Sequence, residues 1–331
     1  MTFLFQCIPF HFLSRLAVLI LLYGTMLISN LSLPSAIAAE PIMAAIVTAD
    51  LPRYQQVHEA MVKVLQAGGF GEDKLKIFKQ TPSADKMSLA NSLRRAEAAG
   101  AELIVTYGSQ STTTAQVELK NTPLLFADVY DPVALGTVKT LTAPGTDASG
   151  ATSKTDLGLL VESLLAITPV KTVGVLYTKG ERGSEQQLAE LVEKGKILGF
   201  SVSAENARNP EEAKKLGGKL ANESEALFLT ESIAVAQQAQ DILAAAQTGK
   251  CIVFSQIPGL VEAGALIGLE ADLEEQGKLV AVHALQALQG QKVHLLPVRE
   301  AKKVSLKINQ QAVGKKGLTA PPAVASKALL M

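Results

Sequence analysis

The chain has 331 residues, 48% of them hydrophobic, and its 31 Lys and Arg residues balance 31 Asp and Glu residues. This composition is typical of a globular protein of two medium-sized domains, not of a disordered chain. Without a basic excess there is no indication of nucleic-acid binding, and no long run of like charge indicates a disordered tail.

Residues 1–38 have the pattern of a secretory signal peptide. Arg15 precedes an apolar run over residues 16–33, and an A-x-A cleavage sequence follows at 36–38. We therefore expect cleavage of this segment and a soluble, exported protein in the periplasm. The alternative is an uncleaved N-terminal membrane anchor, because the apolar run is long for a signal peptide.

The next part of the chain alternates between short apolar runs and amphipathic segments. Strands are predicted at residues 42–48, 75–78, 103–106 and 124–129, and helices at 55–67, 84–99 and about 111–119. Short connections between alternating strands and helices predict a parallel sheet with helices on both faces.

Residues 142–153 are small and turn-forming, and they interrupt this alternation. Beyond them, helices are predicted at 156–167, 185–198, 210–220 and 234–247, and strands at 172–176, 200–204, 226–229 and 251–254. The remaining segments are a strand at 265–269, a helix at 273–288, strand-like runs at 293–298 and 304–308, and an Ala- and Pro-rich tail expected to lie over the surface. The sequence therefore predicts an α/β fold of two similar, doubly wound Rossmann-like lobes joined by a hinge.

Signatures of catalysis and of metal binding are missing. The sequence has no G-x-S-x-G, Walker A, G-x-G-x-x-G or H-E-x-x-H motif. His58, His283 and His294 are scattered without ligand spacing, and Cys251 opens a predicted buried strand, as an inert core thiol does. With Cys7 removed in the signal peptide, no internal disulfide is expected. We predict a protein that is not an enzyme and that has no cofactor or metal.

Polar residues gather where the strand at 103–106 ends. Ser109, Gln110, Ser111 and Thr112 lie between this strand and the helix that follows. The unpaired N–H groups and the dipole of a helix N-terminus favour an anion such as a carboxylate, and the hydroxyls add donors. The alternative is that Ser111 or Thr112 only caps the helix.

Tyrosines are placed at the same ends of predicted strands. Tyr107, Tyr130 and Tyr177 each follow a strand directly, and Tyr54 lies just past the first one, near Asp50. Tyrosine offers an apolar face and a hydroxyl group, which suits the wall of a small-ligand cleft. Packing at the sheet ends is the alternative explanation.

Three further residues hold equivalent positions at strand ends. Asp131 precedes Pro132, which alone is also a common way to start a turn. In the second half, Glu231 and Gln256 follow predicted strands, and Glu231 is best placed to meet a cation of a ligand. A Glu at a helix N-terminus is also favourable without any ligand.

With these segments in order, the chain resembles substrate-binding proteins of ABC transporters, in particular the group that includes binding proteins for tryptophan and other amino acids. The segments that carry the resemblance include GAELIVTYGSQST, PLLFADVYDPVALGTV, VGVLYTKGE, EALFLTES and CIVFSQIPGLVEAGALIGLEADLEEQGKLVA. The resemblance covers nearly all of residues 42–325. Its most specific part is P-x-x-F-x-x-V-x-D-P-V-x-x-G, from Pro123 to Gly136.

This resemblance implies a type I periplasmic-binding fold, in which three crossovers join two lobes around the ligand. The crossovers include one near residues 149–153 and one near 265–269. Lobe one would hold residues 40–150 and 270–290, lobe two residues 151–265, and residues 291–331 would form C-terminal strands and a tail. Matching positions suggest ligand contacts at Asp50, Ser111, Thr112, Asp131, Glu231 and Gln256.

The chain departs from the family pattern at two of these positions. Gln256 stands where the family often has Asp, and Glu231-Ser232 where it often has Asp-Asn. We expect a monomeric, extracytoplasmic solute-binding component of an ABC importer that serves a permease and an ATPase. Its ligand would be a small carboxylate-bearing solute, an amino acid or a related compound, enclosed by hinge closure. The alternative is a periplasmic sensing module that partners a membrane receptor or kinase.

Overall fold

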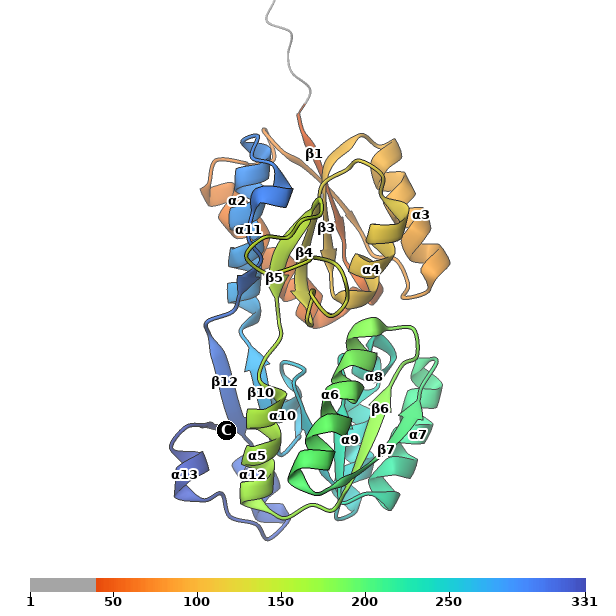
Figure 1. Ribbon diagram of the computed structural model, residues 1–331, viewed down its shortest axis with the longest axis vertical. Coiled ribbons are helices and arrows are strands. Elements are labelled where there is room, and N and C mark those ends of the chain that lie inside the picture. Colours follow the sequence, from red (N-terminus) through yellow and green to blue (C-terminus); the bar gives the residue numbers. More distant parts are fainter. Residues whose placement is uncertain (1–39) are drawn as a thin grey trace, which may run out of the picture. The chain divides into compact units, whose positions relative to one another are not determined.

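The computed structural model describes residues 40–331, and the predicted signal peptide at 1–38 lies outside the described residues. Pro41–Met331 forms one unit that contains two α/β lobes, each built on its own sheet (Figure 1). No helix in this described part is both long and apolar enough to cross a membrane.

The sheet of lobe one has six strands in the order β11-β5-β4-β3-β1-β2, and all neighbouring strands are parallel. They are β1 (Ile42–Ile46), β2 (Lys76–Gln80), β3 (Ala101–Tyr107), β4 (Leu124–Val129), β5 (Ala148–Thr152) and β11 (Arg299–Glu300). In a parallel sheet the carboxyl ends of the strands meet at one edge, which here faces lobe two (Figure 1).

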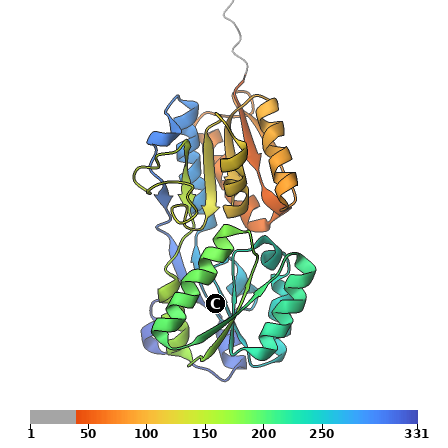
Figure 2. The same cartoon turned by 45° about the vertical axis from the view of Figure 1, so that its right-hand side comes forward.

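Helices cover both faces of this sheet (Figure 2). They are η1 (Thr48–Asp50), α2 (Pro52–Ala67), α3 (Lys86–Ala98), α4 (Ser109–Glu118), α11 (Leu273–Leu288) and η2 (Val293–Leu295). Met61 of α2 and Val280 of α11 pack with Val105 of the sheet on one face. On the other face, Leu93 of α3 lies in a core cluster with Phe126 of β4. Each face of the sheet therefore has its own apolar core.

The sheet of lobe two has seven strands in the order β13-β12-β10-β9-β8-β6-β7. They are β6 (Thr172–Tyr177), β7 (Ser201–Asn206), β8 (Ala226–Leu229), β9 (Ile252–Ser255), β10 (Ile267–Ala271), β12 (Val304–Ile308) and β13 (Leu329–Leu330). Only the pair β10 and β12 is antiparallel. The predicted α/β fold with two parallel-dominated sheets is confirmed.

The helices of lobe two also divide between two faces. They are α5 (Leu157–Ile167), α6 (Arg182–Leu198), α7 (Pro210–Glu223), α8 (Ile233–Gln237), α9 (Ala239–Thr248), α10 (Leu260–Ala263), α12 (Gln310–Lys315) and α13 (Pro322–Ala325). Leu160 of α5 and Leu191 of α6 share a core cluster with Phe228 of the sheet. Leu220 of α7 and Ile242 of α9 belong to the cluster on the opposite face.

The chain passes between the lobes three times, as its alternation between the two sheets requires. The crossovers lie between β5 and α5, between β10 and α11, and between β11 and β12. The second lies a few residues beyond the predicted 265–269, because β10 (Ile267–Ala271) still pairs with β9 and β12 in lobe two. The C-terminal strands divide between the lobes: β11 joins lobe one, and β12 and β13 join lobe two.

Three local predictions were wrong. Residues 293–298 were predicted to be strand-like, but they contain the 3₁₀ turn η2, and β11 follows at Arg299. The helix predicted at 234–247 is two helices, because Gln238 has non-helical dihedral angles. The turn-forming stretch 142–153 contains the buried strand β5, whose Gly150 has no room for a Cβ beside the carbonyl of Phe126.

Candidate functional site

Arg53 lies at the centre of the contact between the lobes. Its side chain is 7% exposed, and its Nε lies 3.4 Å from Oδ2 of Asp128 in an ion pair. Its Nη2 donates to the hydroxyl of Tyr54 at 2.8 Å and to the backbone carbonyl of Glu231 at 3.1 Å. Because Glu231 follows β8 in lobe two, one guanidinium binds both lobes.

The position of Arg53 opposes the local field of its helix. Pro52 starts α2 at N1, so Arg53 lies in the first turn, where the helix dipole disfavours a cation. Burial alone would lower the pKa of Arg53, but Tyr54, Asp128 and Glu231 raise it above its usual value. The side chain therefore stays charged between the lobes, and its neighbours compensate the helix dipole.

Glu231 reaches across from lobe two to the start of α4. Its Oε1 accepts a hydrogen bond from Oγ of Ser109 at 2.5 Å, and its N–H donates to Oε1 of Gln187 at 2.7 Å. The side chain carboxylate thus occupies the helix N-terminus where the sequence predicts a ligand carboxylate. Gly183 of α6 makes this possible, because a Cβ there would overlap the carboxylate of Glu231.

Acidic side chains outnumber basic ones around Arg53. Burial raises the pKa of Glu231 to about 7, although Arg53 and the Ser109 hydroxyl oppose the change. Burial also raises the pKa of Glu181 to about 7, although its Oε2 accepts a hydrogen bond from the N–H of Ile233 at 2.9 Å. With Asp128, three carboxyl groups therefore act on one guanidinium.

Two hydroxyls predicted to bind an anion donate hydrogen bonds to backbone carbonyls in this structure. Oγ of Ser111 donates to the carbonyl of Tyr107 at 2.7 Å, and Oγ1 of Thr112 donates to the carbonyl of Gly108 at 2.8 Å. Of the four residues in the predicted cluster, Ser109 is the one whose side chain bonds to lobe two.

The tyrosines after the strands have different surroundings. The hydroxyl of Tyr107 lies 2.8 Å from Nδ1 of His58 in the core of lobe one, and burial lowers the pKa of His58 to about 4. The hydroxyl of Tyr130 donates to Glu190 of α6 at 2.6 Å, across the lobes. Tyr177 is half-buried at the end of β6. Of these three tyrosines, Tyr130 is therefore the one bonded across the lobe contact.

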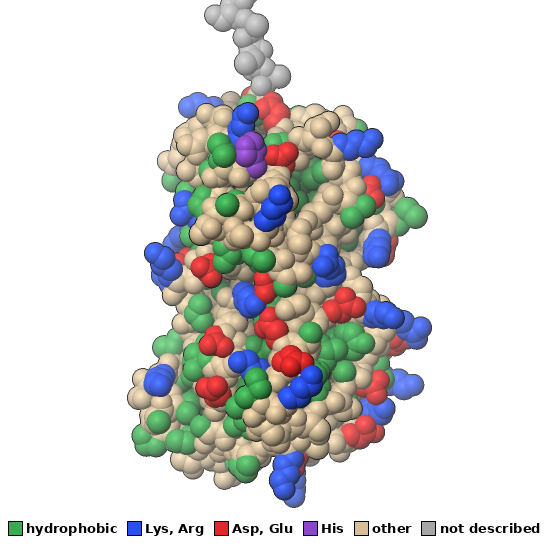
Figure 3. Space-filling model, viewed as in Figure 1, with side chains coloured by type: hydrophobic (Ala, Val, Ile, Leu, Met, Phe, Trp, Pro, Cys, Tyr) green, Lys and Arg blue, Asp and Glu red, His purple; other side chains and the backbone are tan. Residues whose placement is uncertain are grey.

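The remaining predicted residues are divided between the surface and the crossover. Asp50 is exposed and accepts a hydrogen bond from Gln55. Gln256 donates to Oγ1 and the carbonyl of Thr155 at 2.7 and 3.1 Å, on the first crossover. Asp131 forms an ion pair with Lys154, also on that crossover. Figure 3 shows acidic and basic side chains side by side where the lobes meet.

Strained backbone marks the same edge of lobe one. Within the described residues, the non-glycine residues with positive φ are Ala49 (55°), Asp50 (52°), Asp128 (52°) and Asp131 (44°). All lie in or just after β1 and β4, at the ends that face lobe two. Residues with a Cβ seldom adopt such angles, and those that do cluster at binding and active sites.

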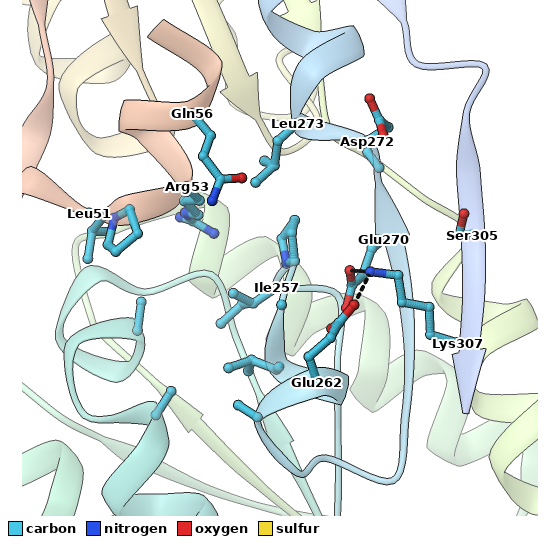
Figure 4. Close-up of a pocket in the computed structure, with 18 of the residues that line it drawn as sticks. Leu51, Arg53, Gln56, Ile257, Glu262, Glu270, Asp272, Leu273, Ser305 and Lys307 are labelled. Atoms are coloured by element: carbon cyan, nitrogen blue, oxygen red, sulfur yellow. Dashed lines mark hydrogen bonds and ion pairs between the residues drawn. The ribbon is translucent and has the colours of Figure 1, made fainter. Parts of the chain in front are cut away.

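Two cavities flank this centre. One, of about 540 Å³, lies between the start of α2 and the segment from α10 to β12 (Figure 4). Its walls include Leu51, Ile257 and Leu273, with Arg53 on one side and Lys307 on another. The other cavity, of about 680 Å³, is lined by loops of both lobes that carry Asp50 and Glu181, among other residues.

The wall of the first cavity that belongs to lobe two carries an ion-pair network. Nζ of Lys307 lies 2.6 Å from Glu262 and 2.6 Å from Glu270, and the side chain of Glu270 is 4% exposed. No group of His, Cys, Asp and Glu among residues 40–331 is arranged to hold a metal ion. The cavity therefore offers apolar walls, a guanidinium and an acidic cluster that is paired with one lysine.

This fold and this contact between lobes define a two-lobed substrate-binding protein of the periplasmic-binding type. The chain belongs to the ABC transporter substrate binding protein family, whose model matches residues 43–330. The resemblance predicted from the sequence is confirmed. The family and the relatives below consist of solute-binding proteins, not enzymes.

One relative is a tyrosine-binding protein of Clostridioides difficile strain R20291, 23% identical over 264 residues, which are 79% of this chain and 76% of the relative. Among solved structures, an ABC domain from Streptococcus pneumonia in complex with L-Trp is 22% identical with a TM-score of 0.83. A ligand-free, open substrate-binding protein with adhesive properties from Clostridium difficile is 25% identical with a TM-score of 0.65. Each alignment covers 88% of this chain and 99% of the other.

The two lobes are in contact in this structure. The buried bonds from Arg53 and Ser109 of lobe one to Glu231 of lobe two join them directly. The structure therefore describes a closed arrangement of the lobes.

Proposed function

We propose that this protein is the extracytoplasmic solute-binding component of an ABC importer, and that it binds a small carboxylate-bearing solute, an amino acid or a related compound, between its lobes. The observation that carries the proposal is the buried Arg53 on the wall of an interlobe cavity of about 540 Å³. Cavities of this size with apolar walls and a few polar groups are typical ligand sites.

Arg53 supplies the anion-binding group. Its Nη2 donates to Tyr54 and to Glu231, and its Nε lies in an ion pair with Asp128 but forms no hydrogen bond. Its Nη1 forms no hydrogen bond to another described residue. A guanidinium pairs well with a ligand carboxylate. Glu262 and Glu270, which line the same cavity and share Lys307, would attract the ammonium of a ligand. An amino acid satisfies both ends.

Binding by hinge closure follows from contacts made by both lobes. A ligand that touches Arg53 from lobe one and Ile257 or Leu260 from lobe two stabilises the closed arrangement over the open one. We propose that the predicted signal peptide exports the protein, that it acts as a monomer, and that a permease and an ATPase receive its ligand. The names of the relatives make L-tyrosine and L-tryptophan the first ligands to test.

Isothermal titration with L-tyrosine, L-tryptophan and a panel of other amino acids and carboxylates tests the proposal. Native mass spectrometry of the protein purified from its source would detect a bound ligand that is not in this panel. Arg53→Gln should weaken binding about 100-fold, because charged, buried hydrogen bonds contribute several kcal/mol. Arg94→Gln is the matched control, since Arg94 of α3 is 61% exposed in an ion pair with Glu118.

Two results would contradict this assignment. If Arg53→Gln folds, as judged by its circular dichroism melt, and binds as tightly as the unchanged protein, Arg53 does not hold the ligand. If no amino acid or carboxylate binds while native mass spectrometry reveals another class of compound, the proposed ligand class is wrong.

A further inference from the structure

A second group of charged residues joins the lobes outside both cavities. Lys154, on the first crossover, forms ion pairs with Asp131 of lobe one and with Oε1 of Glu190 on α6 of lobe two, the latter at 3.0 Å. The Tyr130 hydroxyl of lobe one donates to the other carboxylate oxygen of Glu190 at 2.6 Å. None of these four residues lines either of the two cavities beside Arg53, whereas Lys154 and Glu190 line a separate, more open hollow of about 620 Å³.

Both carboxylates are held in place by their own elements. Oδ1 of Asp131 accepts a hydrogen bond from the N–H of Ala134 at 3.0 Å, and its backbone adopts φ 44°. Oε1 of Glu190 accepts one from Gln186 of the same helix at 3.1 Å. The side chains of Asp131 and Glu190 are 15% and 23% exposed, so water screens the group only in part.

Lys154 can form both of its ion pairs only while the two lobes are in contact. Asp131 and Glu190 belong to different lobes, so separation of the lobes breaks at least one of the two pairs with Lys154. Both carboxylates have an oxygen within 3.0 Å of Nζ of Lys154, so they lie close to each other across the contact. Without the ammonium of Lys154, the two negative charges would repel each other. Lys154 therefore adds an attraction and cancels a repulsion.

We propose that Tyr130, Asp131, Lys154 and Glu190 form a latch that stabilises the closed arrangement and thereby sets ligand affinity without touching the ligand. When only the closed form holds a ligand tightly, the apparent affinity scales with the fraction of closed protein. The latch acts in the ligand-free protein as well, so it goes beyond the proposed function and does not depend on which solute is bound.

The first test measures the distance between the lobes without ligand. Spin labels at Val117→Cys on α4 and Ile197→Cys on α6 lie on opposite lobes at exposed positions. Lys154→Met should shift the population of label distances toward the open form, and Lys154→Arg should retain the closed one. Lys196→Met is the matched control, because Lys196 pairs with Glu193 within α6 and joins no second lobe.

The second test uses the predicted repulsion. Adding Glu190→Gln to Lys154→Met removes one of the two facing carboxylates, so it should restore part of the closed population. In 1 M NaCl the unchanged protein should approach the distances of Lys154→Met, because salt screens partly exposed charges. An unchanged distance distribution in Lys154→Met, or an equal shift in Lys196→Met, would overturn the latch.

Ligand binding is a separate readout. With L-tyrosine as the probe, Lys154→Met should weaken binding about three- to tenfold, because partly exposed ion pairs such as those of Lys154 are individually weak. If L-tyrosine binds no variant, the proposed ligand is wrong, and the distances in ligand-free protein still decide the latch.

Discussion

Glu231→Gln tests whether the carboxyl group of Glu231 is enclosed between the lobes in solution. Burial raises the pKa of this group from an ordinary 4.5 to about 7. A raised pKa means that the folded protein favours the neutral acid. Its contribution to stability is therefore fully present below about pH 4.5 and is lost as the pH rises through 7.

The size of the effect follows from the two pKa values. At a pH well above 7, keeping the charged carboxylate buried costs about 3 kcal/mol relative to the unfolded chain. Gln has nearly the same shape and no charge. At pH 5 the stabilities of Glu231→Gln and the unchanged protein should differ by less than about 1 kcal/mol from this term, and at pH 8 the variant should be more stable by up to about 3 kcal/mol.

Urea unfolding at pH 5 and pH 8, followed by circular dichroism, measures this difference. Glu181 has a raised pKa too, but it is present in both proteins, so most of its contribution cancels in the comparison. Glu193→Gln, at an exposed position of α6, is the matched control for removal of a carboxyl group. If the stability difference between Glu231→Gln and the unchanged protein is equal at both pH values, the carboxyl group is solvated and the lobes do not enclose it.

Two glycines give further predictions, with Gly218→Ala as their common control because a Cβ at Gly218 of α7 meets nothing within 4 Å. Gly183→Ala should place a Cβ against the carboxylate of Glu231, so small-angle scattering should show an open protein and ligand affinity should fall by about tenfold or more while the fold is kept. Gly277→Ala should place a Cβ against the backbone carbonyl of Val57 and separate α11 from α2, lowering the free energy of unfolding by about 1–3 kcal/mol in a urea titration. Gly218→Ala should instead leave stability unchanged or raise it by about 0.5–1 kcal/mol, and an equal loss in this control would contradict both explanations.

Elements with a clear pattern of hydrophobic residues were predicted well from the sequence. The helix at 273–288 and the strand at 124–129 have the predicted bounds, because amphipathic spacing or a fully apolar run leaves few alternatives. The error at 293–298 has the opposite cause. Val293 and Val298 are buried, but only η2 and the two-residue β11 form around them, and apolar residues alone do not show whether a backbone is extended.

The side chains of the site were harder to predict than the elements that carry them. Ser109, Ser111 and Thr112 are similar donors in the sequence, yet Ser109 bonds to lobe two and the others bond to their own backbone. Rotamers and a second lobe decide this, and neither is visible in a residue pattern.

Arg53 is the residue of the proposed site that was not predicted from the sequence. A signal for it was present, because Pro52 marks the start of a helix and a cation in the first turn is unfavourable there without a partner. The partner, Asp128, comes from a different strand, and its positive φ gave no sign in the sequence.

The alternation of the chain between the two sheets also has a consequence for the order in which the protein can fold. The apolar face of lobe one under α2 needs α11, which is synthesised after nearly all of lobe two. Lobe two in turn needs β12 and β13 from the last residues of the chain to complete its sheet. Lobe one can therefore complete its sheet only after Glu300 has been made, and lobe two only after Leu330. A chain that ends before Arg299 exposes apolar surface in both halves.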